Sequence, residues 1–196
     1  MALLKPSKLK IDAQVFCEQE FENRYSTIVA FGRLLFVQGF VAVCVYRFGR
    51  WVYSLPHGIR YAFKIPYFIA SKAVEITTGI MLPPSVEVGE GLYIGHFGSI
   101  IINGGSVIGQ NCKISHEVTL GTKGAGRSLG APIIGDDVYI GAGAKILGNI
   151  HVHNRAVIGA NAVVVKDVPE AAVVGGVPAK IIGYNPSLPQ KLNKPL

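Results

Sequence analysis

Residues 134–164 read Ile134-Gly-Asp-Asp-Val-Tyr, Ile140-Gly-Ala-Gly-Ala-Lys, Ile146-Leu-Gly-Asn-Ile-His, Val152-His-Asn-Arg-Ala-Val and Ile158-Gly-Ala-Asn-Ala-Val, followed by Val164. An aliphatic residue thus recurs every six positions, which fits neither the 3.6-residue period of a helix nor the two-residue alternation of a strand. A parallel β-helix accounts for the step, because three short strands with one inward aliphatic residue each would close a triangular coil of roughly 18 residues. Each coil would bury these residues only by stacking on the next one.

The same step occurs upstream, at Ile108, Ile114 and Leu120 and at Val88, Ile94 and Ile100. Glycine directly follows seven of these twelve aliphatic residues, and we expect it at corners whose backbone conformation a Cβ would resist. Two interruptions are expected on the functional face: an insertion of two residues after Ile94, which contains His96, and an extruded loop at 122–131. A β-sandwich with chance spacing is the alternative, and the unbroken run of six matches argues against it.

The sequence divides into three parts. These are an N-terminal helical region at 1–75, a β-helix domain at 76–183 and a flexible C-terminal tail at 184–196. Within the first part, Tyr25–Leu55 and Ile59–Val74 are expected to be helical, with interruptions at Pro56, Gly58 and Pro66.

Composition excludes several classes of protein. Apolar residues make up 49% of the chain and charged residues 16%, which argues against disorder and coiled coil. Residues 1–76 hold ten of the 19 Lys/Arg and five of the 12 Asp/Glu, and the aromatic residues are not interleaved with this charge, so nucleic-acid binding is not expected. Cys17, Cys44 and Cys112 lack metal-ligand spacing and are expected to be reduced thiols of a cytoplasmic protein.

The apolar stretch Phe31–Tyr46 stands beside the basic N-terminal excess. Arg33 and Gln38 interrupt it, so we do not expect it to span a membrane. It predicts at most a peripheral membrane contact at the inner face of the membrane. The alternative is that it packs on the solenoid or on a neighbouring subunit.

Longer runs extend the pattern beyond the repeat. They are Gly-His-Phe-Gly-Ser-Ile-Ile-Ile (95–102), Val-Thr-Leu-Gly (118–121), Gly-Ala-Gly-Ala-Lys-Ile-Leu-Gly-Asn (141–149), Gly-Val-Pro-Ala-Lys-Ile-Ile-Gly (176–183), Arg-Tyr-Ser-Thr (24–27), Gln-Gly-Phe-Val-Ala (38–42) and Tyr-Arg-Phe-Gly-Arg-Trp (46–51). With these runs the chain resembles the hexapeptide-repeat acyltransferases, in the serine acetyltransferase-like branch that includes polysaccharide and sugar O-acetyltransferases. The resemblance implies a mainly β fold, a left-handed parallel β-helix with an N-terminal α-helical region, and acetyl transfer from acetyl-CoA.

The resemblance implies a catalytic histidine, and His96 stands at its position. A hydroxyl must lose its proton as it attacks a thioester, and imidazole titrates near neutral pH. His116 is the rival, because it occupies the equivalent place in the next coil, where the two rings would lie roughly 5 Å apart. The aspartate that orients the histidine in serine enzymes is matched by Met81, so Glu75 is the candidate substitute, ahead of Glu117.

The same resemblance places acetyl-CoA in a groove between adjacent solenoids of a homotrimer. The residues implied along its path are Gly121, Thr122, Ala142, Gly143, Ala144, Lys145, Lys166 and Lys180. Small residues expose backbone to the pantetheine amides, and lysines supply point charges for phosphates, although each lysine alone is as readily a solvated residue. No metal is expected.

The acceptor is interpreted as a carbohydrate hydroxyl, as in surface polysaccharide synthesis. Serine is a zwitterion and needs charged partners. The aspartate that precedes the histidine in serine enzymes is Gly95 here, and Gly130 and Ala131 replace their Arg-His pair. Serine O-acetylation for cysteine synthesis is the alternative, which Arg127 could support. A third hypothesis is a catalytically silent solenoid, either a scaffold or a metal enzyme, and the latter would need three converging histidines.

Overall fold

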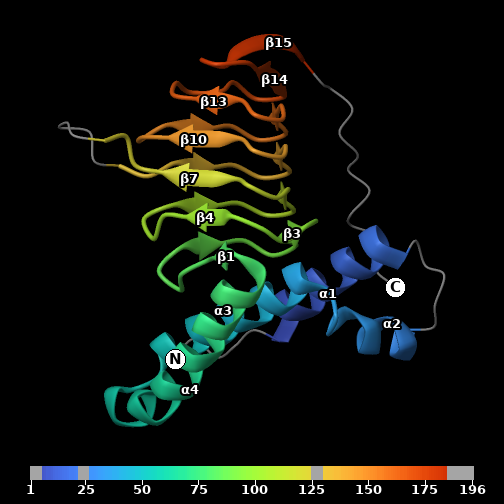
Figure 1. Cartoon of the computed structure of the whole chain (residues 1–196), viewed down its shortest axis with the longest axis vertical. Coiled ribbons are helices and arrows are strands. Elements are labelled where there is room, and N and C mark those ends of the chain that lie inside the picture. The colour runs from blue at the N-terminus through green and yellow to red at the C-terminus, as the bar shows by residue number, and fades with distance from the viewer. Residues whose placement is uncertain (1–5, 22–26, 125–129, 185–196) are drawn as a thin grey trace.

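A computed structural model describes residues 6–21, 27–124 and 130–184 of the 196-residue chain. It consists of a stack of short-stranded coils with helices gathered at one end (Figure 1). The solenoid begins directly after the last helix. Arg127 and half of the expected extruded loop at 122–131 lie outside the described residues.

Each coil contributes one strand to each of three sheets. Sheet A holds β1 (Ile80–Met81), β4 (Ile100–Ile102), β7 (Thr119–Gly121), β10 (Lys145–Leu147) and β13 (Val163–Val164). Sheet B holds β2 (Glu87–Val88), β5 (Val107–Ile108), β8 (Ile133–Ile134) and β11 (His151–Val152). Sheet C holds β3 (Tyr93–Ile94), β6 (Lys113–Ile114), β9 (Tyr139–Ile140), β12 (Val157–Ile158), β14 (Ala172–Gly175) and β15 (Lys180–Tyr184). Neighbouring strands run parallel except β14 and β15, which close the stack as an antiparallel pair.

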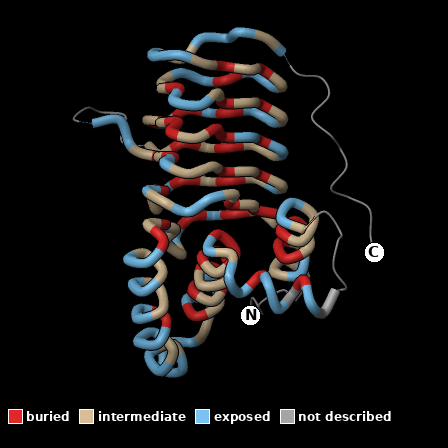
Figure 2. Tube along the Cα trace, turned by 45° about the vertical axis from the view of Figure 1, so that its right-hand side comes forward, coloured by how far each residue is buried: buried red, intermediate tan, exposed pale blue. Residues whose placement is uncertain are grey.

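The six-residue step defines the core of the stack. All twelve aliphatic residues of the repeat are buried, as the sequence predicted, and they line the inside of the coils (Figure 2). The expected insertion lies in the corner between β3 and β4, because Ile94 pairs with Ile114, 20 residues on, whereas Ile102 pairs with Leu120, 18 residues on. Ile100 and Ile102 of β4 are both buried.

The glycines that follow the aliphatic residues have a different role from the one expected. Residues with positive φ at the corners are mostly not glycine, and they include Asn111, Asp137 and Asn161. A Cβ added at Gly109 would instead lie 2.6 Å from the backbone of Gly135 in the next coil. Gly89, Gly109, Gly135 and Gly141 are needed because backbone of the next coil lies within 3.0 Å of the place a Cβ would take, and their φ values are ordinary.

Four helices precede the coils in the described part of the chain. They are α1 (Pro6–Phe21), α2 (Thr27–Leu34), α3 (Gln38–Ser54) and α4 (His57–Thr78). The expected helical stretch from Tyr25 to Leu55 is thus two helices. The expected interruption at Pro66 does not occur, because α4 continues through it. Pro66 has no N–H to donate to the carbonyl of Ala62. Both residues are exposed, so water can satisfy that carbonyl.

The helices dock on the first coil through close packing and buried polar groups. A Cβ at Gly39 would collide with the carbonyl oxygen of Ile94, so glycine lets α3 lie against the solenoid. The Tyr46 hydroxyl donates to the carbonyl of Val86 over 2.8 Å. These contacts hold α3 at the base of the stack.

The stretch proposed for membrane contact is used in this docking. Its residues from Phe40 to Tyr46 are buried or half-buried, and Phe40, Val43 and Tyr46 belong to the core. Packing on the solenoid therefore accounts for the apolar character of Phe40–Tyr46, whereas Leu35 and Phe36 are 68% and 85% exposed, and the peripheral membrane contact stays a prediction. None of the helices in the described part of the chain is long and apolar enough to cross a membrane.

Candidate functional site

The site lies at the corner where the chain turns from sheet C to sheet A. The residue two positions after the buried isoleucine lies at this corner in each of four successive coils. In chain order these residues are His96, His116, Ala142 and Ala160. The coils are in register here, because the amides of Gly95, Ser115 and Gly141 donate to the isoleucine carbonyls of the next coil over 2.8–3.0 Å. Two histidines therefore stand in a column below two alanines.

The two imidazoles are neighbours, as the sequence predicted, but they do not stack. Their ring centroids lie 5.7 Å apart and the ring planes meet at 64°, an edge-to-face arrangement. His96 is exposed, and His116 is half-buried. The Nδ1 atom of His116 is buried and has no hydrogen-bond partner among the described residues.

The backbone around the histidines is firmly held. The amide of Glu117 donates to the carbonyl of Gly98 over 2.8 Å, and the amide of Gly143 donates to the carbonyl of His116 over 3.0 Å. The Nζ of Lys145 donates to the carbonyl of Glu117. The corner is thus fixed to the coils on both sides, and the imidazoles can rearrange mainly by rotation of their own side chains.

Neither expected carboxylate is bonded to a histidine. Glu75 lies on the last turns of α4 and forms an ion pair with Lys72 over 2.5 Å. Glu117 is exposed and holds a left-handed backbone conformation at the turn after His116. No carboxylate among the described residues is hydrogen-bonded to either imidazole. The role of Glu75 as an orienting group stays a prediction.

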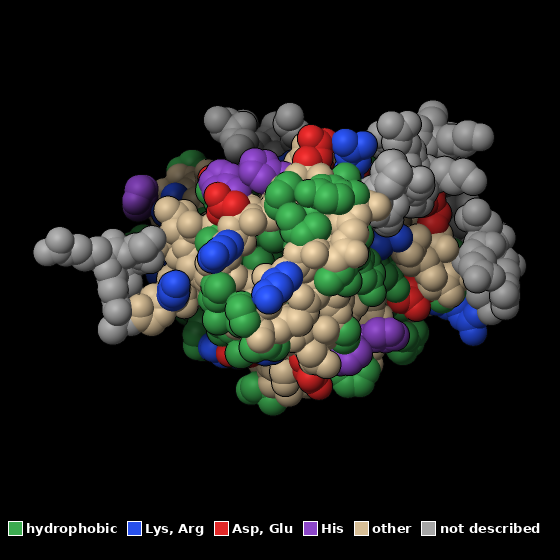
Figure 3. All heavy atoms as spheres, turned by 90° about the horizontal axis from the view of Figure 1, so that it is seen from above, with side chains coloured by type: hydrophobic (Ala, Val, Ile, Leu, Met, Phe, Trp, Pro, Cys, Tyr) green, Lys and Arg blue, Asp and Glu red, His purple; other side chains and the backbone are tan. Residues whose placement is uncertain are grey.

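The expected acetyl-CoA residues fall into three groups around sheet A. Ala142 and Gly143 continue the column directly above His116, and Lys145 follows them on β10. Gly121, Thr122 and Lys166 lie where β7 and β13 end, at the opposite corner of the same sheet. Lys180 begins β15 at the end of the stack, whose surface mixes apolar with basic side chains (Figure 3).

Two of these residues have specific constraints. Gly143 has a φ of +73°, and a Cβ there would collide with the side-chain oxygen of Asn161, so the smooth wall at this point requires glycine. Ala144 does not line the wall as expected. Its side chain is fully buried, its amide donates to Gly141 and its carbonyl accepts from Thr119, so it supports the wall from within.

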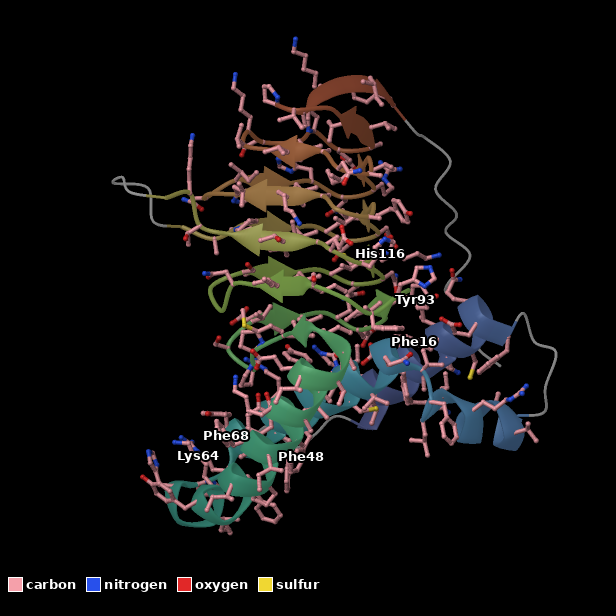
Figure 4. The ribbon with its side chains drawn as sticks, in the orientation of Figure 1. Phe16, Phe48, Lys64, Phe68, Tyr93 and His116 are labelled. Carbon is pink, nitrogen blue, oxygen red and sulfur yellow. The ribbon has the colours of Figure 1, made fainter. Side chains whose placement is uncertain are left out.

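Sequence reasoning missed the wall that α1 builds below the histidines. Tyr93, three residues before His96, packs on Phe16 with ring centroids 4.9 Å apart, and its hydroxyl donates to Glu20 over 2.8 Å (Figure 4). Burial, with Glu20 as the second cause, raises the pKa of Tyr93, so this hydroxyl stays protonated near neutral pH. The pattern of α1 carries no signal for this contact, because its helical face is not clearly amphipathic.

The arrangement can carry out general base chemistry. The imidazole of His96 is exposed, so an alcohol can approach it closely enough to form a hydrogen bond and give up its proton. Above it, the half-buried Ala142 and the exposed Ala160 leave backbone within reach of an extended ligand, whereas Gly143 is buried and its amide donates to the His116 carbonyl. Exposed Lys166 and Lys180 can meet anionic groups further up the stack.

Residues 131–166 match the family model described as bacterial transferase hexapeptide, six repeats. The serine acetyltransferase of Escherichia coli strain K12 is 38% identical over 163 residues, which are 82% of this chain and 55% of that protein. The serine acetyltransferase of Mycobacterium tuberculosis is 42% identical over 120 residues, 61% of this chain and 52% of that protein. The chain spans about half the length of the curated relatives it matches.

Solved structures give the same match. The serine acetyltransferase of Neisseria gonorrhoeae in complex with serine has a TM-score of 0.75 and 31% identity, covering 90% of this chain and 68% of that one. The serine acetyltransferase of Brucella abortus strain S19 in complex with coenzyme A has a TM-score of 0.76 and 30% identity, covering 91% and 67%. The similarity thus includes the helices as well as the coils.

Proposed function

The chain belongs to the hexapeptide-repeat acyltransferases, in their serine acetyltransferase-like branch, and on this premise we propose that it is an acetyl-CoA-dependent serine O-acetyltransferase. His96 acts as its general base. The observation that supports the proposal most is the corner, where the exposed imidazole of His96 lies below a smooth wall of small residues. The chain around this corner superposes on serine acetyltransferases over nine-tenths of its length.

The carbohydrate acceptor expected from the sequence was wrong. The curated relatives at 34–42% identity are serine acetyltransferases, and the solved structures that match include one in complex with serine. The carbohydrate was inferred because charged groups are missing at Gly95, Gly130 and Ala131. Their absence does not exclude serine, because side chains from other elements can supply the same charges.

The reaction follows from the position of His96. The unprotonated ring nitrogen takes the proton of the serine hydroxyl as its oxygen attacks the thioester carbonyl carbon of acetyl-CoA. The resulting tetrahedral intermediate collapses, the carbon–sulfur bond breaks, and the imidazolium returns the proton to the departing thiolate. The products are O-acetylserine and coenzyme A, and His96 ends in its starting protonation state.

Acetyl-CoA would reach His96 along the C-to-A corner. Backbone at Ala142 can meet the amides of the pantetheine arm, Gly143 keeps the wall smooth beneath it, and Gly121 and Thr122 lie across sheet A. Lys166 and Lys180 are exposed near the end of the stack and would face the phosphates. Lys145 already bonds the Glu117 carbonyl, so its contribution is to hold the corner as well as to add charge.

We also propose that the solenoid winds left-handed and that the protein is a cytoplasmic homotrimer. A single triangular stack exposes its corners to water on all sides, so an extended ligand would be only half enclosed by one copy. A second copy against sheet A would complete the groove. Light scattering that shows a stable monomer at micromolar concentration would contradict this assembly.

The test of the function is the release of coenzyme A from acetyl-CoA, followed with a thiol reagent, together with mass spectrometry of the product. We expect release that saturates with L-serine and a product heavier than serine by one acetyl group. D-serine and L-alanine serve as controls, because L-alanine lacks the hydroxyl. Release that is equally slow with and without L-serine would overturn the proposal.

A further inference from the structure

The second histidine of the corner is not needed to move the proton, yet it is held beside the residue that does. We propose that His116 is a positioning residue. In this proposal its Nδ1 accepts a hydrogen bond from one ring N–H of His96, which leaves the other His96 nitrogen free to act as the base. The inference rests on the proposed function for its catalytic consequence, and its structural part can be tested without any substrate.

The distance between the rings is close to that of a hydrogen-bonded pair. An N–H···N bond of about 2.9 Å between two imidazoles places their centroids about 5.2 Å apart. The observed separation is 5.7 Å, with the ring planes at 64°. A small rotation of the exposed His96 side chain is enough to close the gap, and catalytic hydrogen bonds are often long in the free enzyme and shorten in the complex.

The state of His116 gives an independent reason for such a partner. Its Nδ1 is buried without a partner among the described residues, although buried polar atoms are nearly always hydrogen-bonded. The His116 side chain as a whole is half-buried, and the exposed His96 ring lies beside it with the centroids 5.7 Å apart. A neutral imidazole has one accepting nitrogen, and a donor from His96 would satisfy it.

The backbone keeps the two rings together. The amide of Glu117, the residue after His116, donates over 2.8 Å to the carbonyl of Gly98, two residues after His96, and the His116 carbonyl is held by Gly143. The other charged groups around the corner are engaged elsewhere. Lys145 bonds the Glu117 carbonyl and Glu20 accepts from Tyr93, which leaves the Glu117 carboxylate as an exposed charge nearby.

The proposed bond would select one tautomer of His96. An imidazole whose N–H is donated to a fixed acceptor has its lone pair on the opposite nitrogen, pointing away from the partner. That nitrogen then faces the open side of the corner, where an acceptor hydroxyl can approach. A carboxylate performs this orienting task in many hydrolases, and a neutral imidazole can perform it through the same geometry without adding charge.

The direct test is nitrogen NMR of the histidine rings in the substrate-free protein at about pH 8.5, where an ordinary histidine is neutral. We expect His96 in a single tautomer in the wild type and in a mixture of both in His116→Ala. His116→Asn places an amide oxygen near the position of Nδ1 and should restore the single tautomer. An unchanged His96 spectrum in His116→Ala would overturn the proposal, and so would failure of His116→Asn to restore the wild-type pattern in a folded protein.

Kinetics then connect the bond to the reaction. His116→Ala should lower kcat about 10- to 100-fold, the range seen when a group that orients a functional imidazole is removed, with the KM for acetyl-CoA within twofold. His116→Asn should recover most of kcat, and His151→Ala, an exposed histidine of β11, should change neither constant. Recovery by Asn distinguishes positioning from a loss of folding.

The two proposals can fail separately. If the tautomer depends on His116 but serine is not acetylated, the proposed function fails and the positioning role stands. If serine is acetylated and His116→Ala leaves both the tautomer and kcat unchanged, the positioning role fails and the proposed function stands.

Discussion

The base of the stack and the histidine corner both bury polar groups, but only the base satisfies them. Asp12 of α1 is fully buried; its carboxylate accepts from Arg47 and from the amides of Gly91 and Leu92. Arg47 also donates to the carbonyls of Val88 and Gly89. At the corner, by contrast, a ring nitrogen of His116 is buried without a partner in the described part of the chain.

The satisfied polar groups at the base hold the fold together, whereas the unsatisfied ring nitrogen at the corner is available to the reaction. A buried ion pair whose hydrogen bonds are all made fixes α1 and α3 on the first coil and leaves nothing for a ligand. An unsatisfied polar atom costs stability, so it persists where another contact compensates or where function requires it. Substitutions that change one of these buried groups at a time therefore separate the two roles.

The largest effect on stability is expected from Arg47→Ala. It leaves the Asp12 carboxylate buried without its cation, and the free energy of unfolding should fall by about 3–5 kcal/mol, measured by chemical denaturation. Lys72→Ala is the matched control, because its ion pair with Glu75 is solvent-exposed and should be worth at most about 0.5 kcal/mol. Equal costs for the two variants would remove the distinction between the regions.

A smaller effect is expected from Ser106→Ala. Ser106 is 1% exposed, and its hydroxyl, like His116 Nδ1, has no partner among the described residues, but it lies away from the histidine corner, before β5. Removing an unsatisfied hydroxyl should leave the free energy of unfolding unchanged or raise it by up to about 1 kcal/mol, with kcat unaltered. A fall of several kcal/mol would mean that the hydroxyl has a bonded water or other partner.

The coils could be predicted from the sequence because the six-residue spacing of their aliphatic residues is local and repeated. Each aliphatic residue is buried at the same point of every coil, so the period alone predicts the core and the adjacency of His96 and His116. It misread the glycines because a close approach between coils involves residues far apart in the sequence, such as Gly109 and Gly135, which are 26 positions apart. The same limit hid the docking of α1, since Asp12 and Arg47 are 35 residues apart.

The acceptor was misjudged for a different reason. The carbohydrate was inferred from the absence of charged side chains at Gly95, Gly130 and Ala131. The absence of a side chain does not identify the ligand that binds there. The adjacency of His96 and His116 was predicted correctly, because two histidines at equivalent places in adjacent coils must lie together.

In the proposed function, His96 performs the chemistry of the corner while contributing little to the fold. The most direct measurement compares His96→Ala with the wild type for kcat on L-serine and acetyl-CoA and for the midpoint of thermal unfolding, with His151→Ala as the matched exposed histidine. We predict a fall in kcat of about two to four decades with the midpoint within about 2 °C of the wild type. A His96→Ala variant that folds normally and retains wild-type kcat would contradict the account.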